Sequence, residues 1–253
     1  MLLARVRKLR AIVEGEVLPA LQAEAPKVEE TTAPERTDDA SSAAARAVFS
    51  ALSRSKIRWA AEEKRTSGQL DLFLDDTVKS VDAVGKRGLA GQIKAVLGLD
   101  PLLREPFLAT QMVLFRETNV ALIKTIAQQH FSEIEGIVGR GLAAGTRPET
   151  MAKDIEARYE VSRSRARLIA RDQVAKLHGQ LDRLRQQEAG ITRYVWRTSK
   201  DERVRSTHAE RDGQTYEWAD PPGNMDDPAD GGHPGTPIQC RCTAEPVLSD
   251  LLD

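Results

Sequence analysis

The chain has 253 residues, of which 30% are charged and only 4% aromatic, and its formal net charge is −1. This charge excludes a global attraction to nucleic acid, so any DNA contact requires local basic patches. No stretch reaches the roughly 18 to 20 consecutive apolar residues of a membrane span, and the basic start lacks the pattern of a secretory signal, so a soluble protein is expected.

The first predicted element is an amphipathic helix over residues 1–22. Its apolar residues approximate one face: Leu3, Val6, Leu9, Val13, Val17 and Leu21. Residues 23–40 are rich in Ala, Pro, Glu and Thr and predict a flexible linker. Two interpretations of the helix stay open: it docks on a neighbouring subunit, or it folds back on its own domain.

Residues 41–118 predict a series of shorter helices. Ser41 and Ser42 are plausible caps for a helix that continues to about Lys64. Further helices are expected over 70–79, 88–97 and 106–116. The pattern is interrupted by Gly85, Gly88, Gly91, Gly98, Pro101 and Pro106. This region is therefore expected to be irregular and to need a partner for its final shape.

Residues 119–190 predict a helical core. Apolar residues at helical spacing indicate a helix from Asn119 to a stop near Gly145. Thr146 with Glu149 forms a capping box for a second helix over 147–159. A third helix, over 163–188, is expected to be capped by Ser162 and stopped by Gly190, giving three antiparallel helices.

Arginines crowd the expected start of the third helix, where a positive charge opposes the helix macrodipole. Together with two arginines further along, they are the candidate nucleic-acid-binding residues: Arg163, Arg165, Arg167, Arg171, Arg203 and Arg205. Such a cluster predicts an acidic partner, either a carboxylate surface or a phosphate backbone. The alternative is that these side chains are solvated or form ordinary surface pairs.

In residues 191–253 the side-chain pattern changes from helical spacing to the alternation of a strand, which predicts a small α+β mini-domain. Strands are expected over 192–198, 214–218 and 238–247, with a short helix over 203–210. The Pro-, Gly- and Asp-rich loop 219–237 needs something to fix it, such as a metal, a ligand or a subunit contact. The predicted fold class is thus mostly α, with helical N-terminal and central regions and this C-terminal mini-domain.

Both cysteines of the chain lie in that mini-domain. On an extended strand Cys240 and Cys242 point to the same face, which suits two thiolates that bind one ion. His208 and His233 complete a predicted Cys2His2 site for structural zinc, with Asp201 as the substitute if one histidine points away. The alternative is two reduced cysteines in a small core, with His208 bonded to a backbone carbonyl.

An enzyme is the competing class. Asp201, His208, Glu210 and Asp212 resemble the donors of a metal-dependent nuclease. Arginines are interleaved among them and no nuclease motif is complete, so catalysis is not expected. A DNA-binding module that uses the arginine cluster is a third interpretation.

The order of short motifs in the second half resembles the phage head morphogenesis family, the Mu F-like minor capsid proteins. The resemblance covers about residues 119–247 and rests on this series: Ile169-Ala170-Arg171, Trp196, Asp201, Arg203 to His208, Asp212-Gly213 and Cys240-Arg241-Cys242. No single motif is diagnostic, but their joint order is hard to obtain by chance.

This resemblance implies a structural virion protein present in few copies at the portal vertex of a phage head. It would be made in the cytoplasm of the bacterial host and would act in head assembly, DNA packaging or DNA delivery. The implied partners are the portal protein, capsid or scaffolding proteins and packaged DNA, with no membrane. Region 41–118 would dock on the portal, and no fused toxin module is expected.

Overall fold

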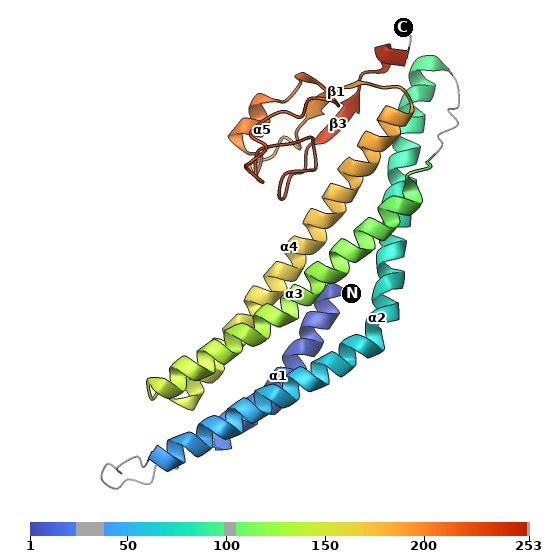
Figure 1. Cartoon of the computed structure of the whole chain (residues 1–253). Coiled ribbons are helices and arrows are strands. Elements are labelled where there is room, and N and C mark those ends of the chain that lie inside the picture. Colours follow the sequence, from blue (N-terminus) through green and yellow to red (C-terminus); the bar gives the residue numbers. More distant parts are fainter. Residues whose placement is uncertain (24–37, 99–104, 252–253) are drawn as a thin grey trace. The chain divides into compact units, whose positions relative to one another are not determined.

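The computed structural model describes residues 1–23, 38–98 and 105–251, and it is mostly helical (Figure 1). In chain order the elements are α1 (Leu2–Ala23), α2 (Asp38–Leu97), α3 (Leu108–Ala143), α4 (Pro148–Glu188), β1 (Arg193–Arg197), α5 (Ser206–Glu210), β2 (Thr215–Glu217), β3 (Thr243–Pro246) and the 3-10 helix η1 (Leu248–Leu251). The predicted fold class is confirmed. Most of the predicted linker, residues 24–37, lies outside the described residues. None of the helices in the described part is long and apolar enough to cross a membrane.

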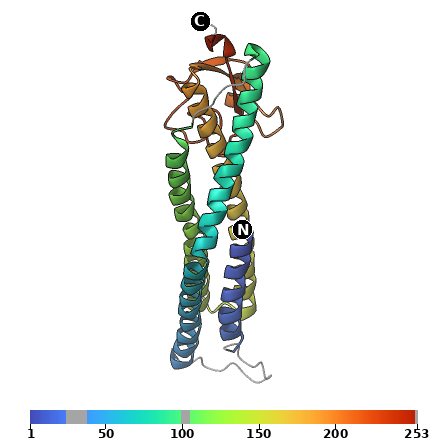
Figure 2. The same ribbon diagram turned by 90° about the vertical axis from the view of Figure 1, so that its right-hand side faces the viewer.

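The chain divides into two compact units, each built from segments that are distant in sequence. Unit 1 comprises Met1–Leu70 and Val120–Arg167, and unit 2 comprises Asp71–Asn119 and Leu168–Asp253. Helices α2, α3 and α4 each contribute residues to both units, as can be followed along the ribbon in Figure 1 and, turned by 90°, in Figure 2. The consecutive ranges expected from the sequence remain predictions.

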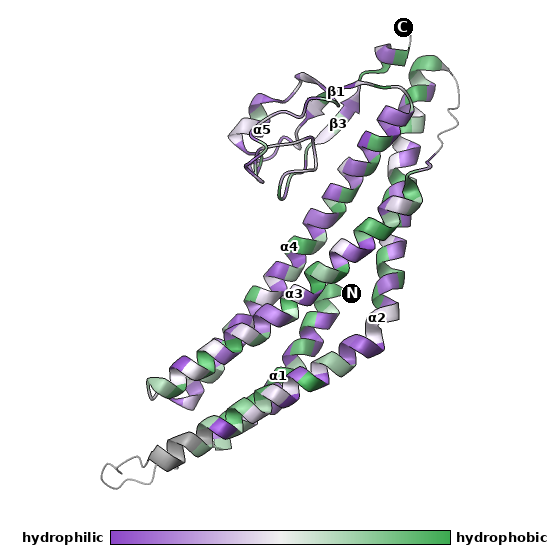
Figure 3. Cartoon of the chain, viewed as in Figure 1, coloured by the Kyte–Doolittle hydropathy of each residue, from purple (hydrophilic) through white to green (hydrophobic). Residues whose placement is uncertain are grey.

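Unit 1 is a helical core to which all four long helices contribute. Its buried residues are Leu9, Ile12, Val13, Val17, Leu21, Val48, Ala51, Leu52, Trp59, Ala127, Phe131, Ile134, Val138, Met151 and Ile155. Figure 3 shows that hydrophobic and hydrophilic residues alternate along each helix, as an amphipathic pattern requires. Because α1 buries its apolar face in this core, it folds back on its own domain, which is the second of the two open interpretations.

The predicted breaks in 41–97 are wrong, because α2 is one helix of 60 residues. Each glycine inside a helix costs about 1 kcal/mol relative to alanine, and this cost motivated the predicted breaks. Tertiary packing offsets it at Gly85, where a methyl group would collide with the guanidinium of Arg185. The two helices expected over 106–116 and 119–145 are likewise joined in α3.

Two predicted helix stops are confirmed. Gly145 has φ of 65° and Gly190 has φ of 84°, the left-handed conformation that glycine adopts without strain. The following amides close the helix ends, since Thr146 N–H donates to the Gly141 carbonyl and Ile191 N–H to the Gln186 carbonyl.

The predicted break at Ser162 is wrong, because α4 continues from Pro148 to Glu188. Ser162 is buried inside this helix and its hydroxyl lies 2.9 Å from Nδ1 of His130 on α3. Serine is a good cap only where its side chain can bond to the first free amides of a helix. Here the buried imidazole of His130 is its partner instead.

The sheet in unit 2 has the order β2-β1-β3, with both pairs antiparallel. Tyr194 and Trp196 of β1 are fully buried and pair with Tyr216 and Ala244 of the neighbouring strands. The core on this face consists of Tyr194, Trp196, Trp218, Cys240 and Cys242. The predicted first and second strands are confirmed within a residue at each end.

A buried charge network joins three segments of unit 2. Arg185 on α4 is 1% exposed, and its Nη2 lies 2.5 Å from Asp82 of α2 and its Nε 2.6 Å from Glu105. Burial opposes the ionisation of Glu105, but hydrogen bonds from Arg185 and Lys86 outweigh it and lower the pKa of this carboxyl. The network therefore fixes α2 and the segment before α3 against α4 within this unit.

Replacement of Arg185 by methionine should lower the free energy of unfolding by about 3 to 5 kcal/mol, because it leaves buried carboxylates without their cation. Urea unfolding followed by circular dichroism measures this loss. The matched control is Arg183→Met, since Arg183 is exposed on the same helix, and it should change stability by less than about 0.5 kcal/mol. Equal effects of the two substitutions would contradict a structural role for the network.

His130 should make unit 1 less stable in acid. Burial, followed by the charge of Arg158, lowers the pKa of His130 to about 4. The unfolded chain takes up this proton below about pH 6.5, whereas the folded chain does not until about pH 4. Stability is thus complete above pH 6.5 and falls by about 3 kcal/mol as the pH drops to 4.

The test compares unfolding free energies of the wild type and His130→Asn between pH 8 and 4.5. The variant keeps a nitrogen or oxygen near Nδ1 but cannot take up the proton. Its stability should fall less steeply below pH 6.5, and parallel curves would show that His130 does not carry this acid sensitivity.

Candidate metal centre

His208 lies on the short helix α5, which the sequence places between β1 and β2. Its side chain is 2% exposed and packs edge-on against the ring of Trp196, with ring centroids 5.2 Å apart. Gly213, at φ of 81°, turns the chain after α5, and its N–H donates to the Trp196 carbonyl. The β1 backbone thus holds both ends of the segment that carries the imidazole.

Cys240 and Cys242 precede β3, and so the strand predicted over 238–247 is wrong at its start. Gln239 has φ of 58°, which breaks the extended conformation. Its N–H donates to the buried carboxylate of Asp172 on α4 at 2.7 Å instead of joining a ladder. The resulting turn brings both thiols inward, and β3 begins only at Thr243.

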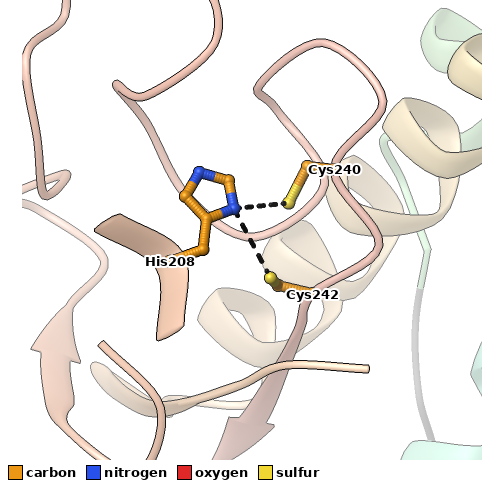
Figure 4. Close-up of side chains that lie close together, drawn as sticks. All are labelled: His208, Cys240 and Cys242. Atoms are coloured by element: carbon orange, nitrogen blue, oxygen red, sulfur yellow. Dashed lines mark hydrogen bonds between the residues drawn. The ribbon is translucent and has the colours of Figure 1, made fainter. Parts of the chain in front are cut away.

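The imidazole and the two thiols meet (Figure 4). Nδ1 of His208 lies 3.7 Å from Sγ of Cys240 and 3.6 Å from Sγ of Cys242. Zinc binds sulfur at about 2.3 Å and nitrogen at about 2.0 Å, which in a tetrahedron separates the donors by about 3.6 Å. Both nitrogen–sulfur distances therefore match those between two ligands of one ion, and all three donor atoms lie within 4.8 Å of one another, so this group can hold a metal.

The two thiols share their protons unequally. Hydrogen bonding with Cys242 lowers the pKa of Cys240 to about 6, against the opposing effect of burial. The Gly235 N–H also donates to Sγ of Cys240 at 3.4 Å. The same pairing, together with burial, raises the pKa of Cys242. Cys240 thus loses its proton more readily than Cys242, and binding of a cation would release the protons that remain on the thiols.

The imidazole is in the form that binds metals. Burial, followed by the positive charges of Arg205 and Arg211, lowers the pKa of His208 and keeps the ring neutral at neutral pH. Nε2, the nitrogen that faces away from the thiols, is buried and makes no hydrogen bond of ordinary geometry with the described residues. The backbone of Ala229 acts against burial and raises the pKa of His208. When the neutral ring carries its one proton on Nε2, the lone pair of Nδ1 points toward the sulfurs.

The second predicted histidine lies elsewhere. Nδ1 of His233 is 2.9 Å from the Tyr194 hydroxyl, and its ring packs edge-on against Trp218. Burial, followed by the charge of Arg183, lowers the pKa of His233 to about 4. The structure thus brings together three of the four predicted ligands. Asp201, the predicted substitute, pairs with Arg241 at 2.5 Å and is not part of the group either.

The long loop between β2 and the cysteines is fixed by polar anchors and close packing. Arg211 is buried beside Trp196 and binds Asp230 through Nη2 at 2.6 Å. On α4, a methyl group at Gly179 would overlap the Pro234 carbonyl oxygen. The loop thus packs directly on the helix backbone, and it reaches the cysteines in a defined position.

The other candidate sites are more dispersed. Of the nuclease-like residues, Asp201 pairs with Arg241 and Asp212 accepts hydrogen bonds from Thr198, while His208 faces the thiols. These three side chains therefore have separate partners.

The predicted conflict between the arginine cluster and the helix macrodipole is wrong, because Arg163 to Arg171 lie in the middle of α4 and the dipole effect fades within the first turn. Several of these side chains have local partners: Arg163 pairs with Glu160, and Arg205 donates to the Ile238 carbonyl. Arg163, Arg165 and Arg167 belong to unit 1, whereas Arg171, Arg203 and Arg205 belong to unit 2. Binding of nucleic acid by this set stays a prediction.

Asp172 supports the site but was not predicted from the sequence. It is 6% exposed, and its carboxylate holds the turn before Cys240 and also pairs with Lys176. In the sequence, Asp172 is one of many charged residues in a segment predicted to be a helix. Its partner lies 67 residues further along the chain, so no local pattern reveals it.

The fold and the site define the class of protein: a mostly helical chain with a small mini-domain that carries a His/Cys/Cys group. Residues 132–245, which include all three donors, match the family described as phage Mu protein F like protein. The predicted resemblance to this family is confirmed over that segment.

One relative is an uncharacterized protein of Haemophilus influenzae, which is 32% identical over 205 residues. The match covers 80% of this chain and 44% of the relative, so the chain spans less than half the length of that protein. No solved structure matches.

The full chain should bind one zinc ion, and loss of any of the three donors should abolish this binding. The variants are His208→Asn, Cys240→Ser and Cys242→Ser, and the measurement is native mass spectrometry after zinc titration. Zinc at 100 times its dissociation constant should also stabilise the wild type by about 2.7 kcal/mol.

The matched control is His233→Gln, which removes an equally buried histidine from the same mini-domain. It should keep the zinc stoichiometry of the wild type. Loss of zinc in this variant would support the four-residue site expected from the sequence, and failure of the wild type to bind zinc would remove the metal centre.

Proposed function

We propose that this chain is a minor capsid protein of a tailed phage, located at the portal vertex and acting in head assembly, DNA packaging or DNA delivery. The observation that carries the proposal is the phage Mu protein F-like match over residues 132–245. This family indicates a protein of head morphogenesis and hence of the virion. The portal, capsid or scaffolding proteins and packaged DNA are its proposed partners.

The metal of the His/Cys/Cys group is proposed to be zinc. Two thiols and one imidazole are donors that zinc prefers, and the buried position in a core of aromatic side chains suits a structural ion. His208 would be tied to the turn that carries Cys240 and Cys242, so that α5 and the end of the long loop are joined. Zinc would thus supply the stability that three short strands cannot supply alone.

Exposed apolar residues on α2 support docking of region 41–118 on the portal. Ile57 is 70% exposed and Leu72 is 68% exposed, and Val84 and Val96 are also more than half exposed. An apolar side chain of this kind gains about 1.5 to 3 kcal/mol when a partner buries it. A long helix with such residues is suited to binding along an extended surface of a larger assembly.

We propose no catalytic activity for the chain. Support comes from Asp201, whose carboxylate pairs with Arg241, and from His208, whose Nδ1 faces two thiols rather than a carboxylate. In this proposal the histidine acts by holding the mini-domain together.

The full chain should form a stoichiometric complex with the portal protein of the same phage, measured by native mass spectrometry. The double variant Ile57→Glu/Leu72→Glu should weaken this complex at least about tenfold, because two exposed apolar contacts are lost without a change in the core. Lys64→Glu, a charge change between them on the same helix, is the control. A wild type that forms no complex would contradict the portal proposal.

A further inference from the structure

A groove of about 570 Å³ lies in unit 2 between α4 and the turn that carries the cysteines. Apolar residues form much of its lining, among them Val174, Ala175, Pro234 and Ala244. Its wall is set by backbone packing, because Cα of Gly179 lies against Gly235 so closely that a methyl group at either position would meet the other segment. Two segments in direct backbone contact cannot close further, so the groove is a preformed feature of this unit.

Both cysteines of the donor group also line this groove, whereas His208 does not. A zinc ion with protein ligands takes four donors in a tetrahedron. In the described part of the chain, the group contains only three metal-binding side chains. The fourth position is therefore free for a ligand from outside, and the groove beside the thiols is the route by which such a ligand can arrive.

The groove also carries a free cation. Arg171 is exposed, lines the groove and has no hydrogen bond or ion pair with any residue that the structure describes. The other charged side chains of the lining are already paired: Arg241 with Asp201, and His178 with Asp182. Arg171 is thus the one guanidinium of the lining that is available to an anion.

We propose that this groove binds the C-terminal carboxylate of a partner polypeptide whose last residue is apolar. One carboxylate oxygen takes the fourth position at the His/Cys/Cys group, and the guanidinium of Arg171 pairs with the carboxylate. The apolar side chain lies against Val174, Ala175 and Pro234. The inference rests on the metal of the proposed function and adds a class of ligand to the same site.

Carboxylate chemistry fits the groove better than phosphate chemistry. A phosphate group favours several cations, whereas Arg171 is the single unpaired guanidinium in the lining. An apolar wall favours binding of a ligand whose charged group is directly attached to an apolar group. A polypeptide terminus with a leucine-like residue combines these two properties.

The test uses the full chain loaded with Co²⁺, whose visible spectrum reports both the thiolate ligands and the coordination number. N-acetyl-leucine is titrated into this protein, and N-acetyl-leucinamide, which lacks the carboxylate, is the matched ligand control. The acid should change the cobalt spectrum in a saturable manner, and the amide should leave it unchanged.

Two variants separate the parts of the inference. Arg171→Met should weaken binding of N-acetyl-leucine by about tenfold, since a charge-assisted hydrogen bond is lost, and it should bind cobalt as the wild type does. Arg203→Met removes an exposed arginine that does not line the groove and should change neither property.

The outcomes distinguish this inference from the proposal on which it rests. A wild type that binds no cobalt would overturn the metal centre itself. A thiolate–cobalt spectrum that does not respond to N-acetyl-leucine would overturn the groove proposal alone, as would an equal response to inorganic phosphate or to the amide.

Discussion

The mini-domain depends on one constraint: two thiols and an imidazole must share a small buried space. His208, Cys240 and Cys242 come from segments more than 30 residues apart in the chain and are all less than about one-tenth exposed. Buried polar atoms without partners are costly, and strands of three to five residues give little stability of their own. The convergence places three donor atoms within reach of one ion, and the proposed zinc would bind all three.

The rest of unit 2 positions these donors. Asp172 of α4 holds the turn before Cys240, and Gly179 of the same helix lets the loop approach the backbone closely. Arg185, one turn and a half further along, joins α4 to α2 through buried ion pairs. Helix α4 thus supports both the helical part of the unit and the turn that presents the thiols. The cysteines consequently belong at once to the donor group and to the wall of the groove.

Local signals predicted the parts of the fold that local interactions determine. The helix ends at Gly145 and Gly190 follow from left-handed glycines, and β1 follows from the alternation of Tyr194 and Trp196. The continuity of α2 was not predictable in this way, because the space that Gly85 leaves is used by Arg185, 100 residues away in the sequence. Ser162 was mistaken for a cap for the same reason, since its partner His130 lies on another helix.

The candidate site shows the same division. The type and order of residues identified Cys240, Cys242 and His208 as donors, and the family match over 132–245 contains all three. Sequence order could not decide between His208 and His233, because the distance from each ring to the thiols depends on tertiary structure. The bond from His233 to Tyr194 and the turn at Gln239 are contacts that no spacing rule encodes.

X-ray absorption at the zinc edge, on the 253-residue chain purified without added metal, decides whether the three donors bind zinc. We expect about one zinc per chain with two sulfur ligands at about 2.3 Å and the remaining ligands nitrogen or oxygen at about 2.0 Å. A chain that contains no zinc, or zinc without sulfur in its first coordination shell, would contradict the claim that His208, Cys240 and Cys242 form a metal centre.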